Sequence, residues 1–193
     1  MAAGAGFDEA IARFDAVHAE DPERDASGQP KELLYARRMS AWLEKLSPAA
    51  SEPLRLAVRC QHIRRWAIRR SDYPEGAAGY RKWRVDEANS HALIAKEILE
   101  SAGYGEAGVQ RVQALVRKEK LKQDPEAQLL EDVICLVFLE NCLAQFAQKL
   151  EEAKLVEILR KTWRKMSPRG HEAALGLKLS APLRAIVEKA VTS

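Results

Sequence analysis

Apolar residues recur along this chain with the spacing of amphipathic helices. Phe7, Ile11, Phe14 and Val17 step by three and four positions, which places them on one face of an α-helix. Similar apolar stripes predict further helices near residues 35–46, 51–70, 91–103, 109–116, 124–138, 155–166 and 180–187. No run alternates apolar and polar residues as a half-buried strand does. We therefore predict an all-α protein.

Two helix starts are marked by their own residues. Ser51 precedes Pro53, and Asp124 precedes Pro125, so each helix opens with a capping side chain and a proline in its first turn. The helix after Asp124 is apolar almost all round, which predicts a long, buried central helix. With 193 residues, we expect one helical bundle over 1–193. Its helical core covers about 7–166, and a helical extension covers about 170–191.

Composition excludes several classes of protein. Apolar residues make up 47% of the chain and charged residues 31%, which is too apolar for a disordered chain. The longest apolar run, 133–139, is far shorter than the ~20 residues of a membrane span. Three cysteines without a Cys-x-x-Cys pair exclude a zinc ribbon. With no signal peptide in view, we expect a cytoplasmic protein with reduced thiols.

Positive charge is concentrated in one segment. The chain carries only +3 overall, yet eight basic and two acidic residues give residues 59–84 a charge of +6. Trp66, Tyr73, Tyr80 and Trp83 are interleaved with these charges. Guanidinium groups suit phosphate and aromatic rings suit base stacking, although a solvated surface is the alternative. The segment has no glycine-rich phosphate loop, and thus no motif for a nucleotide cofactor. The candidate phosphate ligands are Arg59, Arg65, Arg69, Arg84 and Lys118.

Acids and histidines at apolar positions are the candidates for chemistry. Glu131 and Asp132 lie inside the most apolar stretch of the chain, and Glu32 projects from an apolar helix face. His62 and His91 are also placed on apolar faces, where an ordinary core histidine is the alternative. A buried carboxylate is costly unless it is paired with an arginine or bound to a metal.

Several strings resemble the domain-of-unknown-function 4202 family. The likeness extends from the first helix to 161–166, and the family has no established activity. The strings are 32–36 (ELLYA), 61–66 (QHIRRW), 73–74 (YP), 79–84 (GYRKWR) and 130–138 (LEDVICLVF).

More remotely, the helix order is similar to that of the HD superfamily of metal-dependent phosphohydrolases. Those proteins hold a divalent metal with a histidine, a His-Asp pair, often a further histidine, and a late aspartate. Here Gln61-His62 stands where the His-Asp pair would be, and the signature pair is absent. The resemblance implies an HD-like bundle with His62, His91, Asp132 and Glu32 as metal ligands.

Three functions are consistent with these features. In the first, a divalent metal activates water to hydrolyse a phosphorylated small molecule or nucleotide, with Glu131 and Arg65 as catalytic residues. In the second, the same helices bind a nucleotide, RNA or a phosphorylated partner through residues 59–84, without catalysis. In the third, the chain is a structural or partner-binding helical protein.

Overall fold

The protein is built from helices joined by turns and short loops. A computed structural model describes residues 5–191, and within that range it contains no β-strand. The only β-type pairing described is an isolated bridge between Arg24 and Pro30. The all-α prediction is confirmed. The chain divides into two compact units, of which the first ends at Lys120 and the second begins at Leu121.

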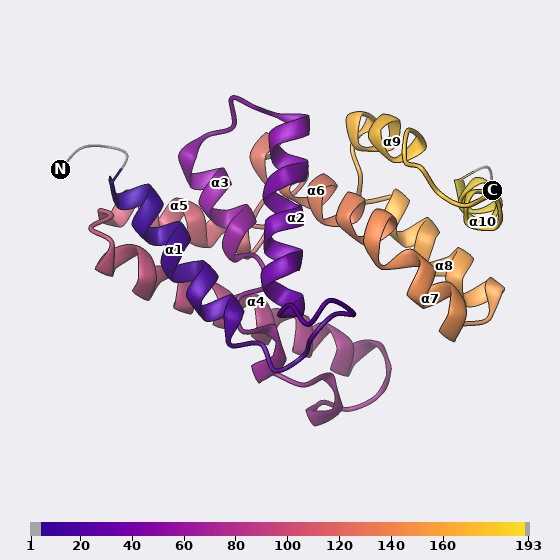
Figure 1. Cartoon of the computed structure of the whole chain (residues 1–193), viewed down its shortest axis with the longest axis horizontal. Helices are drawn as coiled ribbons and strands as arrows, with labels where there is room; N and C mark the ends of the chain where they lie inside the picture. Colours follow the sequence, from indigo (N-terminus) through magenta and orange to yellow (C-terminus); the bar gives the residue numbers. More distant parts are fainter. Residues whose placement is uncertain (1–4, 192–193) are drawn as a thin grey trace. The chain divides into compact units, whose positions relative to one another are not determined.

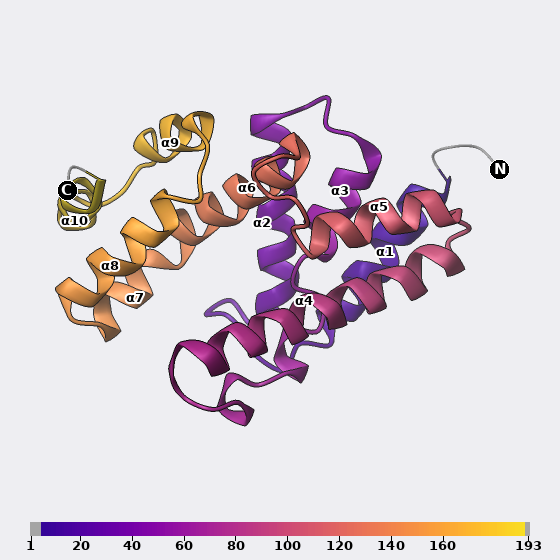
Figure 2. The same ribbon diagram turned by 180° about the vertical axis from the view of Figure 1, so that it is seen from behind.

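Five helices form the first unit. Helix α5 packs against α3 and α4, while α1 packs against α2, α3 and α4, as Figures 1 and 2 show from opposite sides. Phe14, Met39, Leu56, Leu99 and Leu115 are fully buried and form the core of this unit. The helices are α1 (Ala5–Ala19), α2 (Lys31–Leu46), α3 (Glu52–Cys60), α4 (Gly76–Ser101) and α5 (Glu106–Val116).

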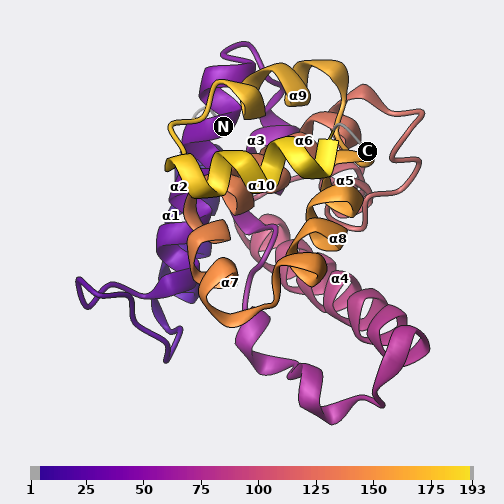
Figure 3. The same cartoon turned by 90° about the vertical axis from the view of Figure 1, so that its right-hand side faces the viewer.

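Five helices also form the second unit. Helix α6 contacts α7 and α9, and α10 packs across α7 and α8 (Figure 3). Helix α6 begins where the sequence predicts, because the Asp124 side chain accepts hydrogen bonds from the backbone N–H groups of Glu126 and Ala127. The helices are α6 (Pro125–Asn141), α7 (Leu143–Lys149), α8 (Glu152–Trp163), α9 (Pro168–Leu175) and α10 (Ala181–Val191).

The third helix is shorter than its apolar pattern predicts. Helix α3 ends at Cys60 instead of continuing to Arg70, and Arg64 adopts a left-handed φ of 53°. The apolar stripe already contains the cause, since Val58 and Ile63 are five residues apart and break the helical period. The chain continues through two 3₁₀ turns, η1 (Arg65–Ala67) and η2 (Arg70–Asp72). Much of the basic segment is therefore irregular backbone.

Helix α4 starts 15 residues before position 91, where the sequence predicts this helix to begin. It runs for 26 residues from Gly76 and is the longest helix described. Gly79 is needed there, because a Cβ at that position would lie 1.8 Å from the Pro74 carbonyl oxygen. Helix α7 lies outside the predicted helices, since seven residues are too few to show a clear period. Helix α9 falls at the start of the helical extension that the sequence predicts over about 170–191.

The remaining sequence expectations concern membranes and thiols. Among residues 5–191, no helix is both long enough and apolar enough to span a bilayer. Within residues 5–191 the structure places Cys60, Cys135 and Cys142 in no disulfide bond, and the first two are buried.

Candidate functional site

Two of the four histidines lie side by side in the first unit. His62 belongs to the turn that follows α3, and His91 lies in the middle of α4. Their ring centroids are 6.2 Å apart, and the residues are only 8% and 3% exposed. The early end of α3 places His62 against α4. The structure thus brings together two residues that are 29 positions apart in the sequence.

The His62 ring is fixed on three sides. Its Nε2 atom lies 3.1 Å from Nη1 of Arg65, and an arginine can only donate, so Nε2 accepts this hydrogen bond. The ring proton of neutral His62 is then on Nδ1, which faces Oε2 of Glu32 at 3.8 Å. The Tyr35 ring stacks on the imidazole with centroids 4.7 Å apart. Both nitrogens and one face of His62 are therefore engaged by the protein.

Glu87 is a second buried carboxylate in this cluster. Its side chain is 1% exposed and lies between two arginines, with Arg84 at 2.7 Å and Arg65 at 3.5 Å. Arg65 thus links Glu87 to His62. Oε1 of Glu87 and Oε2 of Glu32 are buried and accept no hydrogen bond from the described residues. Such acceptors are destabilising unless a bound group satisfies them.

Burial keeps both imidazoles neutral. Burial, together with the Arg65 charge, holds the pKa of His62 well below its ordinary value. Burial, with Arg65 and Arg84 adding, lowers the pKa of His91 to about 3. At neutral pH both rings therefore carry no charge.

Burial acts in the opposite direction on the carboxyls. It raises the pKa of Glu32 to about 7, although the Arg65 charge opposes the change. It also raises the pKa of Glu87, against the charges of Arg65 and Arg84. Glu32 is therefore only partly ionised at neutral pH.

Two cavities open on this cluster. The first, which we call the histidine cavity, has a volume of about 390 Å³ and is lined by His62 and His91. The second, the Glu32 cavity, has a volume of about 520 Å³ and is lined by Glu32 and Arg65. Glu87 borders both cavities.

The two cavities differ in the charge of the residues that line them. The histidine cavity is lined by Arg84, Arg117 and Lys118 against the single acid Glu87, so its charge is +2. The Glu32 cavity has as many acidic as basic residues, namely Asp21, Glu23, Glu32 and Glu87 against Lys31, Arg65, Arg69 and Arg70. The histidine cavity is therefore the better place for an anion.

Strained backbone borders the histidine cavity. Lys118, in the turn after α5, has a φ of 58°, a conformation that residues with a Cβ rarely adopt. Lys120 has a φ of 54° but does not line the cavity. Strain of this kind persists only where the surroundings enforce it, often at functional sites.

The acidic pair of α6 is occupied within the second unit. Asp132 accepts hydrogen bonds from the Ser167 backbone N–H at 2.8 Å, the Ser167 hydroxyl at 2.5 Å, and the Gln128 amide at 3.2 Å. Ser167 is the N-cap of α9. A Cβ at Gly170 would lie 2.7 Å from Oδ1 of Asp132, so α9 approaches this carboxylate closely. Asp132 therefore anchors α9 to α6, and none of these partners is the arginine that the sequence suggests.

The predicted metal ligands do not fit a metal ion. Within residues 5–191, no three His, Cys, Asp or Glu side chains are grouped so that they could hold one. The lone pair of His62 is directed at Arg65, and Asp132 is held by Ser167. Glu131, predicted as catalytic, lies in the second unit 3.7 Å from Lys165.

The predicted phosphate ligands separate into three groups. Arg84 and Lys118 line the histidine cavity, and Arg65 and Arg69 line the Glu32 cavity. Arg59 lines neither, because its guanidinium binds both carboxylate oxygens of Asp15, at 2.6 and 2.7 Å. It ties α3 to α1.

Two of the four aromatic residues of the basic segment are held by hydrogen bonds within the fold. Trp83 is buried and donates its indole N–H to the Ile68 carbonyl at 3.0 Å. The Tyr73 hydroxyl donates to Asp86 at 2.9 Å. Tyr80 is about half exposed.

Sequence reasoning missed Glu87. It lies three residues after Arg84 and four before His91, so all three share one face of α4. This spacing in the sequence indicates that Glu87 lies beside Arg84 and His91.

Comparisons with other proteins identify a family without an activity. The family described as "Domain of unknown function (DUF4202)" matches residues 8–187. No curated protein matches the chain significantly, and neither does any solved structure.

Proposed function

The chain belongs to the DUF4202 family, whose description names no activity, and from the site itself we propose that the first unit binds a small phosphorylated molecule in the histidine cavity. The observation that carries this proposal is the convergence of Arg84, Lys118 and two neutral histidines on one cavity of charge +2. Guanidinium and ammonium groups are the side chains that bind phosphate.

The cavity also offers a place for a ligand hydroxyl. Oε1 of Gln61 is buried and accepts no hydrogen bond from the described residues, while its Nε2 is 3.4 Å from the Val116 carbonyl. A ligand that donates a hydrogen bond would satisfy this oxygen. A phosphate and a hydroxyl together describe a sugar phosphate or the ribose phosphate of a nucleotide.

The size of the cavity supports a small ligand. A volume of about 390 Å³ falls within the ~300–1,000 Å³ typical of small-molecule sites. A single strand of RNA needs exposed rings along a groove, whereas Trp83 is buried and Tyr73 is engaged. We therefore favour a sugar phosphate or nucleotide over RNA.

The site supports binding more than metal-dependent hydrolysis. The ring nitrogens of His62 face Arg65 and Glu32, which leaves no lone pair of that ring for a metal. We therefore assign no step to a metal ion. Hydrolysis of a bound phosphate ester would be detected as release of inorganic phosphate.

Titration calorimetry with ribose 5-phosphate and adenosine monophosphate tests the proposal. The informative variant is Lys118→Gly, because glycine accepts the left-handed φ while the cavity loses a charge. The matched control is Lys120→Gly, which relieves the same strain outside the cavity.

We expect at least one of the two compounds to bind the parent protein. Lys118→Gly should then bind it about tenfold more weakly, while Lys120→Gly binds it like the parent. Equal affinities in all three proteins, or no binding to the parent, would refute the proposal. Tighter binding of a single-stranded oligoribonucleotide than of either compound would favour RNA instead.

A further inference from the structure

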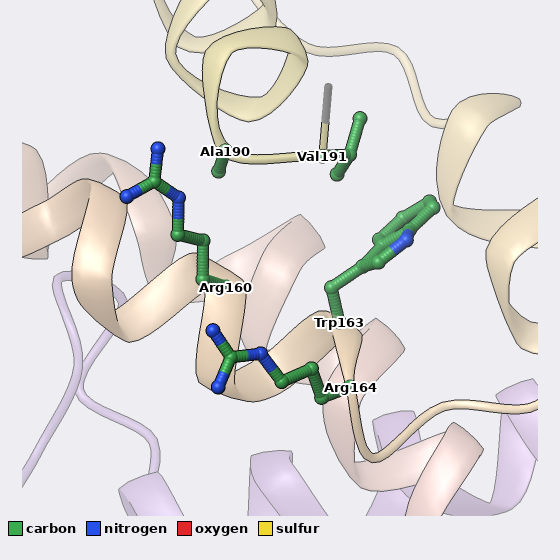
Figure 4. A pocket seen from close by; sticks show the side chains of 5 residues that line it. All are labelled: Arg160, Trp163, Arg164, Ala190 and Val191. Atoms are coloured by element: carbon green, nitrogen blue, oxygen red, sulfur yellow. The ribbon is translucent and has the colours of Figure 1, made fainter. Parts of the chain in front are cut away.

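The second unit contains a cavity of its own, which the sequence patterns do not indicate. It lies between α8 and α10 and has a volume of about 290 Å³. Figure 4 shows Arg160, Trp163 and Arg164 projecting from α8 and the residue after it, with Ala190 and Val191 of α10 across the gap. Basic, aromatic and aliphatic groups thus meet at one place.

The two arginines of this cavity lack acidic partners. Neither Arg160 nor Arg164 has a carboxylate of the described chain within 4.0 Å, whereas Lys161 between them is paired with Glu157 at 2.5 Å. The Nε atom of Arg160 is buried and makes no hydrogen bond to the described residues. A buried donor on a charged group is destabilising unless something accepts from it. An anion in the cavity would do so.

Trp163 is a rigid wall of the same cavity. The His171 ring stacks on its indole with centroids 3.8 Å apart and planes 5° apart. His171 is itself fixed, because its Nε2 lies 2.8 Å from the Trp163 carbonyl, which can only accept a hydrogen bond. One face of the indole is therefore held by the protein, and the side chain lines the cavity at a fixed angle.

From these three observations, we propose that the cavity between α8 and α10 binds a small anion that carries a planar ring, of which an aryl phosphate is the simplest. The guanidinium groups of Arg160 and Arg164 bind the anionic end. Trp163 and the aliphatic side chains of α10 contact the ring. This site is independent of the histidine cavity, because all of its residues belong to the second unit.

Indole N–H signals in a nuclear magnetic resonance spectrum provide the test. The chain has four tryptophans, Trp42, Trp66, Trp83 and Trp163. The signal that disappears in the Trp163→Phe variant is the signal of Trp163. Phenyl phosphate is the probe, with inorganic phosphate and phenol as its separate halves. Because Trp66 and Trp83 lie in the first unit, their signals report separately on events there.

We expect phenyl phosphate to shift the Trp163 signal with an affinity about tenfold higher than that of phenol or inorganic phosphate. Arg164→Ala removes an exposed arginine of the cavity and should lower the affinity for phenyl phosphate about tenfold. Lys161→Ala removes a neighbouring charge outside the cavity and should leave the affinity unchanged.

Three results would overturn the proposal. They are a Trp163 signal that does not respond to millimolar phenyl phosphate, an equal response to phenol, and an unchanged affinity in Arg164→Ala. None of these results depends on ligand binding in the histidine cavity, so the two proposals fail separately.

Discussion

Both units place acids at or near their cores, and these acids differ in how their oxygens are satisfied. In the second unit, both oxygens of Asp132 accept hydrogen bonds from Ser167, and Gln128 adds another. In the first unit, Glu32 and Glu87 each retain a buried oxygen that accepts no hydrogen bond from the described chain.

This difference distinguishes a carboxylate that stabilises the fold from one that belongs to a binding site. A buried carboxylate whose acceptors are all used stabilises the fold and has little capacity for a ligand. A buried carboxylate with an unused acceptor destabilises the fold, which is more easily explained at a binding site. We therefore treat Asp132 as structural and the two carboxylates beside His62 as part of a site.

The largest expected effect comes from removing the structural carboxylate. Asp132→Ala leaves the backbone N–H and the hydroxyl of Ser167 without their acceptor, and α9 loses its attachment to α6. We expect the free energy of unfolding to fall by about 3 kcal/mol, measured by urea denaturation. Asp132→Asn keeps one oxygen and should lose roughly half as much. A loss below about 0.5 kcal/mol in Asp132→Ala would show that this carboxylate does not hold the unit together.

At Glu32, by contrast, we expect removal of the negative charge to stabilise the protein. Its folded pKa, about 7, lies above the ordinary value of 4.5, so the folded state prefers the protonated form. Stability from this group is present below pH 4.5 and is lost as the pH rises through 7. Glu32→Gln mimics the protonated form and should be about 2 kcal/mol more stable than the parent at pH 8.

The stability difference between Glu32→Gln and the parent should depend on pH, which identifies ionisation of Glu32 as its cause. Near pH 4.5 the advantage of Glu32→Gln should disappear, since Glu32 is then protonated in the folded protein. Denaturation curves of both proteins at the two pH values measure this. A constant difference between pH 4.5 and pH 8 would contradict the raised pKa.

The smallest expected effect on stability comes from relieving the strained backbone at Lys118 and Lys120. Lys118→Gly and Lys120→Gly should each stabilise the protein by about 1 kcal/mol, because glycine adopts a positive φ without steric strain. Thermal denaturation of both variants measures the gain. If either variant is destabilised by more than about 1 kcal/mol, the turn after α5 is held by the lysine side chain and not strained by it.

Local signals in the sequence predicted much of the fold. The helical class follows from apolar spacing, and Ser51 and Asp124 mark the starts of α3 and α6 because capping depends on neighbouring residues. The end of α3 was placed ten residues late. The five-residue step between Val58 and Ile63 was visible, but the turn also depends on packing against α4, which the sequence does not show.

The site was predicted only in part, for a similar reason. His62, His91, Glu32 and Arg65 were identified, and they do gather in the first unit. Asp132 is predicted for the same site because the resemblance to the HD superfamily implies a late aspartate among the metal ligands, and because an acid in an apolar stretch needs a partner. That partner is Ser167, 35 residues away, and nothing near Asp132 in the sequence points to it.

The ligand site that we propose belongs to the first unit and does not use Asp132. Calorimetric titration of the parent, Asp132→Asn and Lys118→Gly with whichever of ribose 5-phosphate and adenosine monophosphate the parent binds, at a temperature where all three are folded, tests it most directly. We expect Asp132→Asn to bind like the parent and Lys118→Gly to bind about tenfold more weakly. Loss of binding in Asp132→Asn with unchanged binding in Lys118→Gly would contradict it and favour a site built around the α6 carboxylate.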